Sequence, residues 1–437
     1  MSSPRGIELL PDIPICQTDL PLDWYQPEFK PYAEEYLALP DRLPGTVLPW
    51  MDRYILPAQK ELGPKLVLLA HYYMGGEIVK LVERYGGLVA DSYQLAREAV
   101  LHPEKRIFVE SAVHFMAEAI ALLAAPEQEV WITNPKSGCT MEMMAKEFMV
   151  APAFAKLEKR YGESLLVVAY MNTSGRVKAL AGRTGGAVCT SSNAGAIMRW
   201  ALAQKKKIFF VPDQHLGRNV AAEIGLAPEK IQLLPAGHEG GDLSDSELRR
   251  LDSAELVLWG SFCGVHTIFK PSHVAYWHER GYRVAVHPEC PREVVAAADA
   301  HGSTSQLWKL VLDAPKGTRF AVGTEGHFVN NLREQAALRG IEVVHLADLP
   351  GDAAAGCGCA TMSRNDPPHL VALLDLLRKG QAPDLNRVLP GDVVDEVTGA
   401  RERLDPSGQA QVARDARRAL EQMIEITEAA RRGGAHG

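Results

Sequence analysis

Short apolar runs alternate with helical patterns through most of the chain, and this alternation predicts the fold. Residues 65–73 (KLVLLAHYY) and 207–212 (KIFFVP) are rich in the leucine, valine, isoleucine and phenylalanine that fill buried strands. Segments such as 92–101 place apolar residues every three or four positions, which indicates amphipathic helices. Strands that alternate with helices are typical of βαβ units, so the sequence predicts an α/β protein with parallel sheets.

The alternation occurs in three successive units of similar design. The first runs from residue 65 to CT at 139–140, the second from LLVVAYMNTSG (165–175) to FCGVH (262–266), and the third from RVAVHPEC (283–290) to GCGC (356–359). Each unit has a serine or threonine before a helical pattern and closes on a loop with cysteine. Repetition of this kind predicts three homologous αβα (Rossmann-like) domains. We expect them to form a pseudo-threefold trefoil around a central site.

The ends of the chain follow a different pattern. The beginning is rich in proline and has little periodicity, so we expect an irregular arm on the surface. The end carries a charged amphipathic helix followed by a glycine-rich tail. We expect a Pro-rich arm at 1–56, domain 1 at 57–138 (completed by part of 360–437), domain 2 at 139–262, domain 3 at 263–358, and the third cysteine loop with C-terminal helices at 359–437.

Composition and charge exclude several classes of function. The chain is 46% hydrophobic and 23% charged, with a formal net charge of −7, so we expect no nucleic-acid partner. No apolar stretch is long enough to span a bilayer, and no secretory signal opens the sequence. Seven cysteines in a chain of this length do not make a disulfide scaffold. We expect a cytoplasmic protein with reduced thiols and no membrane partner.

Three cysteines occupy equivalent positions at the ends of the three units: Cys139, Cys263, and either Cys357 or Cys359. Ligands of parallel sheets bind outside the carboxyl ends of the strands, so three such ends facing one centre would bring these thiols together. A zinc site completed by His266 is one interpretation. The other is a 4Fe–4S cluster with one open iron that acts as a Lewis acid.

Hydroxyl side chains recur before the helical patterns of the three units, at Ser92, Ser191, Ser303 and Thr304. Plain helix capping is one explanation. Anion binding is the other, because a helix N-terminus offers free N–H donors and the positive end of a dipole. Three such ends around one centre predict a pocket for a substrate with several negative groups. The sequence has no Walker loop and no complete G-x-G-x-x-G, so we do not expect a nucleotide.

A further set of polar side chains ends apolar strands or adjoins a pocket cysteine. Groups of this kind around one pocket indicate acid–base chemistry. Alternation along 65–73 places His71 and Tyr73 on the same side, which favours Tyr73 over Tyr72. The set comprises His71, Tyr73, Tyr170, Asn172, His266, His287 and Glu289.

Several motifs together resemble the quinolinate synthase family. They include AHYY, HFMAE, YMNTSG, PDQHLGRNVA, HPEC, GSTS, VGTEG and CATMSRN, in that family's order, over roughly residues 60–370. The resemblance implies a trefoil around one 4Fe–4S cluster held by three cysteines. It also implies the condensation of iminoaspartate with dihydroxyacetone phosphate to quinolinate, phosphate and water in NAD biosynthesis.

The resemblance also assigns residues. The cluster ligands are Cys139, Cys263 and Cys359, the last chosen because it matches a pattern with Met362 and Asn365. Tyr73 and Glu289 are implied to transfer protons, with His266 near the departing phosphate. The other pocket residues bind substrate: His71, Ser92, Tyr170, Asn172, Ser191, His287, Ser303 and Thr304.

Two alternatives remain at this point. One is an iron–sulfur reductase of the hydroxymethylbutenyl diphosphate reductase type, which shares the three-cysteine logic but needs electrons. The other is a non-enzymatic iron–sulfur sensor, which would need no acid–base pocket. If the chain is a quinolinate synthase, an aspartate-oxidising enzyme is the candidate partner that supplies the imine.

Overall fold

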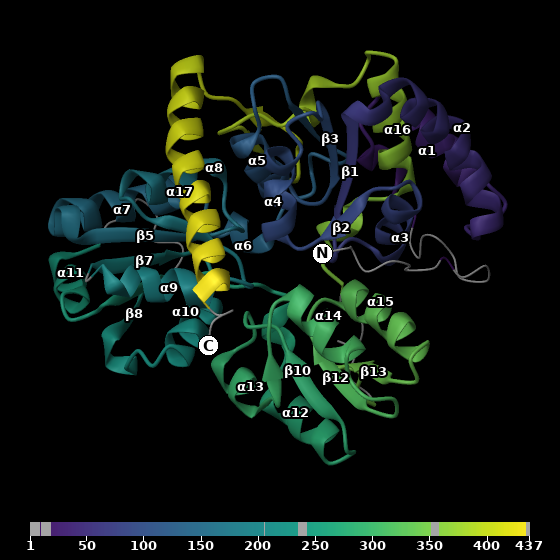
Figure 1. Ribbon diagram of the computed structural model, residues 1–437. Coiled ribbons are helices and arrows are strands. Elements are labelled where there is room, and N and C mark those ends of the chain that lie inside the picture. The colour runs from purple at the N-terminus through teal and green to yellow at the C-terminus, as the bar shows by residue number, and fades with distance from the viewer. Residues whose placement is uncertain (1–8, 10–18, 205, 235–242, 351–357, 434–437) are drawn as a thin grey trace.

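Three parallel sheets flanked by helices form the body of the protein (Figure 1). The computed structural model describes residues 9, 19–204, 206–234, 243–350 and 358–433 of the 437-residue chain. The elements of the first, second and third sheets occupy three separate parts of Figure 1, in blue, teal and green. The expected α/β class with several parallel sheets is therefore confirmed, whereas the pseudo-threefold trefoil and the domain boundaries stay predictions.

The first sheet has the strand order β2-β1-β3-β4, and its strands are all parallel. Its strands are β1 (Leu66–His71), β2 (Leu88–Ala90), β3 (Ile107–Ser111) and β4 (Glu129–Ile132). The crossover helices are α3 (Gly76–Arg84), α4 (Ser92–Leu101) and α5 (His114–Leu123).

The second sheet repeats this order as β6-β5-β7-β9 and adds β8 at its far edge. Its strands are β5 (Leu165–Tyr170), β6 (Ala187–Cys189), β7 (Lys207–Val211), β8 (Ile231–Leu234) and β9 (Leu256–Trp259). Its helices are α6 (Thr140–Met143), α7 (Glu147–Tyr161), α8 (Gly175–Arg183), α9 (Ala194–Ala203), α10 (Gln214–Glu223) and α11 (Asp245–Leu251).

The third sheet has the same order once more, β11-β10-β12-β13. Its strands are β10 (Arg283–Val286), β11 (Ala300–His301), β12 (Arg319–Gly323) and β13 (Glu342–His345). The associated helices are α12 (Pro271–His278), α13 (Arg292–Ala297), α14 (Thr304–Leu312) and α15 (Gly326–Ala337). In all three sheets the first strand pairs with the second and third, so the chain crosses each sheet in the same way.

The described part of the N-terminal segment is largely helical, so the expectation of an irregular arm is wrong for residues 30–62. It contains α1 (Lys30–Leu37) and α2 (Pro44–Leu62), both of which pack on α16 (Pro367–Arg378). Pro31 and Pro44 stand in the first turns of their helices, where a missing N–H costs nothing. Phe29 and Trp50 are buried, so tertiary packing of aromatic residues stabilises helices that the proline content obscured.

The C-terminal helix α17 (Pro406–Gly433) lies against the first two units. It packs along α8 and β6 and also contacts α5 and α9 (Figure 1). Before it, β14 (Val393–Val394) and β15 (Arg401–Glu402) form a small antiparallel hairpin. Among the described residues, no helix is both long and apolar enough to cross a membrane.

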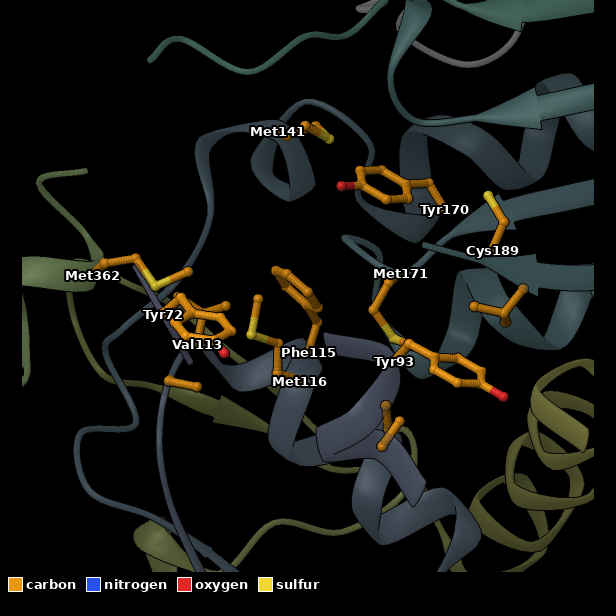
Figure 2. Close-up of a cluster of buried hydrophobic side chains, with 14 of the residues drawn as sticks. Tyr72, Tyr93, Val113, Phe115, Met116, Met141, Tyr170, Met171, Cys189 and Met362 are labelled. Atoms are coloured by element: carbon orange, nitrogen blue, oxygen red, sulfur yellow. The ribbon is translucent and has the colours of Figure 1, made fainter. Parts of the chain in front are cut away.

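The largest hydrophobic core continues from the first unit into the second. Figure 2 shows part of it, where Phe115 and Met116 of α5 face the same interior as Met141 of α6 and Met171 after β5. Met362, from the segment after the third cysteine, reaches the same region. This packing holds the ends of the strands in place below the polar residues described next.

Candidate functional site

One pocket is lined by residues from all three sheets, at the carboxyl ends of their strands. This is the edge at which parallel α/β sheets bind ligands. The lining comprises His71, Tyr73, Asp91, Ser92, Met116, Cys139, Tyr170, Asn172, Thr190, Ser191, Ser192, Cys263, Val265, His266, His287, Glu289, Thr304, Glu325, Cys359 and Met362.

The residues singled out in the sequence are brought together here, except for one. Among the described residues, Ser303 does not belong to the lining, although its neighbour Thr304 does. Tyr72 turns away from the pocket and stacks on Trp308, with ring centroids 5.7 Å apart. The sequence analysis missed Asp91 and Glu325, among others. Both follow buried strands, so the strand-end rule that located His71 and Tyr170 would have found them.

Cys139, Cys263 and Cys359 enter the pocket from three different loops, after β4, after β9 and in the segment that follows the third sheet. Burial raises the pKa of each thiol. Cys359 raises the pKa of Cys139 further, and Glu289 followed by the other two thiols raises that of Cys263. Three thiolates in such a place need a compensating positive charge, as a metal centre provides. Cys189 and Cys290 are buried outside the lining, and Cys16 and Cys357 lie outside the described residues.

The three thiols are accompanied by further possible metal ligands. In the described part of the chain, ligand atoms of Cys263, His266 and Glu289 lie within 4.8 Å of one another, a group that could hold a metal ion. The pocket therefore offers sulfur, nitrogen and oxygen donors beside Cys139 and Cys359.

Glu289 is the centre of a buried group of polar side chains. The Tyr170 hydroxyl donates a hydrogen bond of 2.5 Å to Glu289 Oε1, and His266 Nδ1 lies 2.9 Å from Glu289 Oε2. His287 Nδ1 lies 3.9 Å from the same oxygen, and the rings of His266 and His287 stack with centroids 4.6 Å apart. Tyr170 ends β5, His266 follows β9, and His287 and Glu289 share the loop after β10, so the arrangement joins three separate parts of the chain.

Burial and this arrangement set the charges of the group. Burial by itself would raise the pKa of Glu289, but His287, His266 and the hydrogen bonds to the carboxylate outweigh it and lower the pKa to about 2. Burial lowers the pKa of both His71 and His287 to about 3, although Glu289 partly opposes it. At neutral pH the site therefore holds the Glu289 anion together with neutral imidazoles at His71 and His287.

Tyr73 reaches the same group through a residue that the sequence analysis did not select. The Tyr73 hydroxyl and the Thr324 hydroxyl lie 2.8 Å apart, and Thr324 Oγ1 lies 3.0 Å from His266 Nε2. Burial, and then the charge of Glu289, raise the pKa of Tyr73 well above its usual value, so the phenol is neutral. Thr324 follows β12 and is fully buried.

The helix ends near the pocket differ in detail from the capping pattern expected. Asp91, not Ser92, caps α4, with Oδ1 accepting a hydrogen bond from Gln94 N at 3.0 Å. Asn193, not Ser191, is the N-cap position of α9. Only Ser303 stands at the cap position itself, in front of α14, where its backbone N–H donates a hydrogen bond of 2.7 Å to Gln306 Oε1.

Glu325 fixes the third cysteine in place. Its Oε1 accepts a hydrogen bond of 2.8 Å from the backbone N–H of Cys359, and its Oε2 accepts one of 2.9 Å from Phe328 N at the start of α15. The Thr361 hydroxyl lies 3.1 Å from Cys359 Sγ. Gly358 packs so tightly that a Cβ there would come within 2.6 Å of His327 Nε2. The loop therefore has little freedom at this cysteine.

Comparison with known proteins gives consistent results. The family model described as Quinolinate synthetase A protein matches residues 54–425. The quinolinate synthase of Acidobacterium capsulatum is 38% identical over 368 residues, which cover 83% of this chain and 92% of that protein. That of Streptomyces coelicolor is 38% identical over 357 residues, 81% and 87% of the two chains. That of Corynebacterium glutamicum is 34% identical over 426 residues, 96% and 98% of the two chains.

Among solved structures, the E-1-hydroxy-2-methyl-but-2-enyl-4-diphosphate reductase from Plasmodium falciparum matches with a TM-score of 0.25 and 14% identity. The match covers 70% of this chain and 81% of that chain. A similarity of this size carries no argument about fold or function.

Proposed function

This chain belongs to the quinolinate synthase family of enzymes, and from that premise we propose that it condenses iminoaspartate with dihydroxyacetone phosphate to quinolinate, phosphate and water. The observation that carries the proposal is the convergence of Cys139, Cys263 and Cys359 from three loops on one pocket that also holds acid–base groups. A sensor would need the cysteine trio but not the acid–base group. A simple hydrolase would need the acid–base group but not the cysteine trio.

The cofactor we propose is one 4Fe–4S cluster held by Cys139, Cys263 and Cys359. The convergence of three cysteines on the pocket, with no fourth described cysteine in its lining, supports this choice, because a cluster held by three thiolates keeps one iron open. When bound, the cluster supplies a Lewis-acidic iron, which assists the departure of a hydroxyl in dehydration. Backbone and side-chain contacts around Cys359, from Glu325 and Thr361, hold that ligand in position.

Both substrates carry negative groups, and the helix ends beside the pocket suit them. Ser92 is the first residue of α4 and Thr304 the first residue of α14, so free backbone N–H donors accompany their hydroxyls. Ser191, Asn172 and His71 offer further donors or acceptors from the other strand ends. We assign the substrate carboxylates and phosphate to this surface, with Ser303 behind it at the cap of α14.

Three side chains are assigned to the proton transfers: Tyr73, Glu289 and His266. Tyr73 holds a proton at its hydroxyl, next to Thr324 Oγ1. Glu289 is ionised before the reaction, so it can accept a proton, and it stabilises any positive charge that forms on His266, 2.9 Å away. His266 lies close to Cys263, so we assign it to the part of the pocket where phosphate departs. Tyr170 orients Glu289 through its hydrogen bond.

The imine substrate hydrolyses in water, so it must be produced close to the time of use. We propose an aspartate-oxidising enzyme as its source. The net charge of −7 and the pocket offer nothing for a nucleic acid, and small molecules are the expected partners.

Anaerobic turnover tests the proposed function. Protein purified without oxygen and replete in iron and sulfide should form quinolinate from iminoaspartate and dihydroxyacetone phosphate with no added reductant or nucleotide. Chromatographic detection of quinolinate and release of phosphate in equal amounts would support the assignment. No quinolinate from cluster-replete protein would refute it, and turnover that requires a reductant would point to a reductase instead.

A further inference from the structure

The loops that carry Cys139 and Cys359 are joined to each other away from the pocket. Residues 133–137 lead from β4 to Cys139, and residues 361–365 follow Cys359. Two of the three pocket cysteines therefore lie on segments that share one buried junction. The junction is formed by side chains with at most 4% of their surface exposed, namely Thr133, Ser137 and Asn365.

Asn365 is the centre of this junction because it uses both ends of its side-chain amide. Its Oδ1 accepts a hydrogen bond of 2.6 Å from the Thr133 hydroxyl. Its Nδ2 donates bonds of 2.9 Å to Ser137 Oγ and 3.2 Å to the Ala112 carbonyl oxygen. The Ser137 hydroxyl in turn donates a bond of 2.8 Å to the Thr361 carbonyl oxygen. The two segments thus donate hydrogen bonds to each other in both directions.

The amide of Asn365 has one orientation that satisfies these partners. In the reversed orientation, Oδ1 would face the Ala112 carbonyl oxygen, which has no proton to donate. It would also face Ser137 Oγ, whose single proton is already donated to the Thr361 carbonyl oxygen. A side chain fixed in this way sets the distance between the two segments.

The residue after Asn365 is anchored as well. Asp366 caps α16, where its Oδ1 accepts a hydrogen bond of 3.1 Å from His369 N and lies 2.6 Å from His369 Nδ1. The Tyr25 hydroxyl donates to Asp366 Oδ2, and the Tyr25 ring stacks on His369 with centroids 4.7 Å apart. The N-terminal segment therefore helps to fix the chain at the end of the junction.

A junction of this kind matters for a metal centre because the ligands must be held in place before the metal binds. Ligands bind a metal tightly when the residues around them fix their geometry in advance. The contact of Glu325 with the Cys359 N–H holds one ligand. The contacts of Asn365 hold the segments of two ligands at once.

We propose that Asn365 is a positioning residue for the cluster, which joins the loops of Cys139 and Cys359 into one preformed pair of ligands. The proposal rests on the proposed function, because that function assigns a cluster to these cysteines. Asn365 acts through the segments it joins, and among the described residues it does not belong to the pocket lining. Its contribution is the retention of iron rather than a step of the chemistry.

Three variants test the junction by the rate at which cluster-replete protein releases iron. Release is followed without oxygen in an excess of a chelator that gives a coloured complex with ferrous iron. Thr133→Val keeps the shape and removes the hydroxyl, whereas Thr133→Ser keeps the hydroxyl and removes the methyl group. Loss of a residue that supports metal ligands costs about 10- to 100-fold in metal affinity. We expect Thr133→Val and Asn365→Ala to release iron at least about tenfold faster than wild type, and Thr133→Ser to stay close to wild type.

Asn193→Ala is the matched control. Asn193 is also buried, and it donates a hydrogen bond of 2.9 Å to a residue 234 positions away, Thr427, just as Asn365 accepts one from a residue 232 positions away. Its replacement should lower the thermal unfolding midpoint, as that of Asn365 does, and leave the rate of iron release near wild type. Decay of the visible absorbance in the same samples gives a second readout, which should rank the variants in the same order.

The outcomes separate the junction from the proposed function. Wild type that holds the cluster and forms no quinolinate would refute the proposed function and leave the junction standing. If Asn365→Ala and Thr133→Val release iron no faster than Asn193→Ala, the junction is refuted and the function stands. Equal acceleration in Thr133→Val and Thr133→Ser also overturns it, because the effect would then belong to packing. If Asn365→Ala does not fold, the two Thr133 variants decide.

Discussion

At the scale of single residues, the pocket cysteines differ from the other described cysteines in what surrounds their sulfur atoms. Cys189 lies in strand β6 within the core, and Cys290 Sγ lies 3.6 Å from the Gly323 carbonyl oxygen, to which its thiol donates. Cys139, Cys263 and Cys359 instead face a polar pocket and one another. Of the described cysteines, only these three are placed to share a metal centre.

Substitution of any pocket cysteine should therefore remove the cluster. Cys139→Ser, Cys263→Ser and Cys359→Ser should each lose the brown absorbance and the labile sulfide of protein purified without oxygen, because three thiolates are needed to hold the cluster. Cys189→Ala and Cys290→Ala should keep both. Cys357 lies outside the described residues, and Cys357→Ser should also retain the cluster. Loss of iron in Cys357→Ser but not in Cys359→Ser would show that the ligand was assigned to the wrong cysteine.

Substitution of a proton-transfer group should lower the rate and leave the cluster intact. Tyr73→Phe and Glu289→Gln should lower kcat by at least about 100-fold while iron, sulfide and the visible spectrum stay unchanged, since neither side chain is a cluster ligand. Steady-state assays without oxygen, together with metal analysis of the same samples, check this. Rates near wild type in both variants would contradict the roles given to them, although not the family.

Glu110 gives a prediction about pH and stability. Its carboxylate is fully buried and its oxygens have no hydrogen-bond partner among the described residues, so burial raises its pKa from 4.5 to about 8. The folded protein then holds a proton that the unfolded chain releases above pH 4.5. The associated stability is complete below pH 4.5 and is lost as the pH rises to about 8.

Glu110→Gln keeps the shape of the side chain and removes this titration. The variant should match wild type in stability at pH 5 and exceed it at pH 8 by something on the order of 2 kcal/mol. Thermal or denaturant unfolding at the two pH values measures the difference. If the difference in unfolding free energy between Glu110→Gln and wild type did not change with pH, it would contradict a buried carboxylate that lacks a compensating partner.

Pocket residues could be predicted from the sequence where a single local rule, such as strand alternation or position at a strand end, identified them. Period-two alternation selected Tyr73 over Tyr72, and strand ends selected Tyr170 and His287, which line the pocket. The same rule was not applied to Thr324, which follows β12 as His287 follows β10. Ser303 shows the limit of the rule, because adjacent hydroxyls share a sequence signal and only the three-dimensional path of the chain decides which one faces the pocket.

At the scale of elements, the contact between α8 and α17 joins parts of the chain that are distant in sequence. Gly182 of α8 lies against the backbone of α17, and a Cβ at this position would come within 1.8 Å of the Asp415 carbonyl oxygen. Asn193, at the start of α9, donates a hydrogen bond of 2.9 Å to Thr427 Oγ1 of the same helix. The C-terminal helix therefore supports the segment that carries Ser191.

Gly182→Ala should destabilise the protein, since neither backbone can yield without moving a whole helix. A loss of about 1–3 kcal/mol is expected for overpacking at such a contact. Gly45→Ala is the matched control, because Gly45 lies in α2 with nothing within 4 Å of its added Cβ. Alanine there should be neutral or stabilising by up to about 1 kcal/mol. Equal thermal unfolding midpoints for the two variants would contradict the close approach of α8 and α17.

The elements that the sequence failed to predict are those that tertiary contacts stabilise. Helix α2 contains Pro49 and Pro57 in its interior, which local rules interpret as breaks. Burial of Trp50 and Ile55 against the rest of the molecule compensates for those prolines. Local periodicity was sufficient for the core strands, because their apolar runs are short, continuous and bounded by turns.

At the scale of the whole molecule, the three sheets share one strand order, and each contributes strand-end residues to one pocket. The repeat in the sequence predicted this convergence, since equivalent loops in homologous units occupy equivalent places. The sequence could not supply the contacts across units, such as Tyr170 with Glu289 or Tyr73 with Thr324, because they join residues more than a hundred positions apart.

Metal and sulfide analysis of the purified protein tests the central claim most directly, namely that three cysteines from three units hold one iron–sulfur cluster in this pocket. Protein isolated without oxygen should contain about four iron and four labile sulfide per chain, with broad absorbance near 400 nm that fades in air. One zinc per chain with no labile sulfide would contradict the account, because a single tetrahedral ion would then occupy the site.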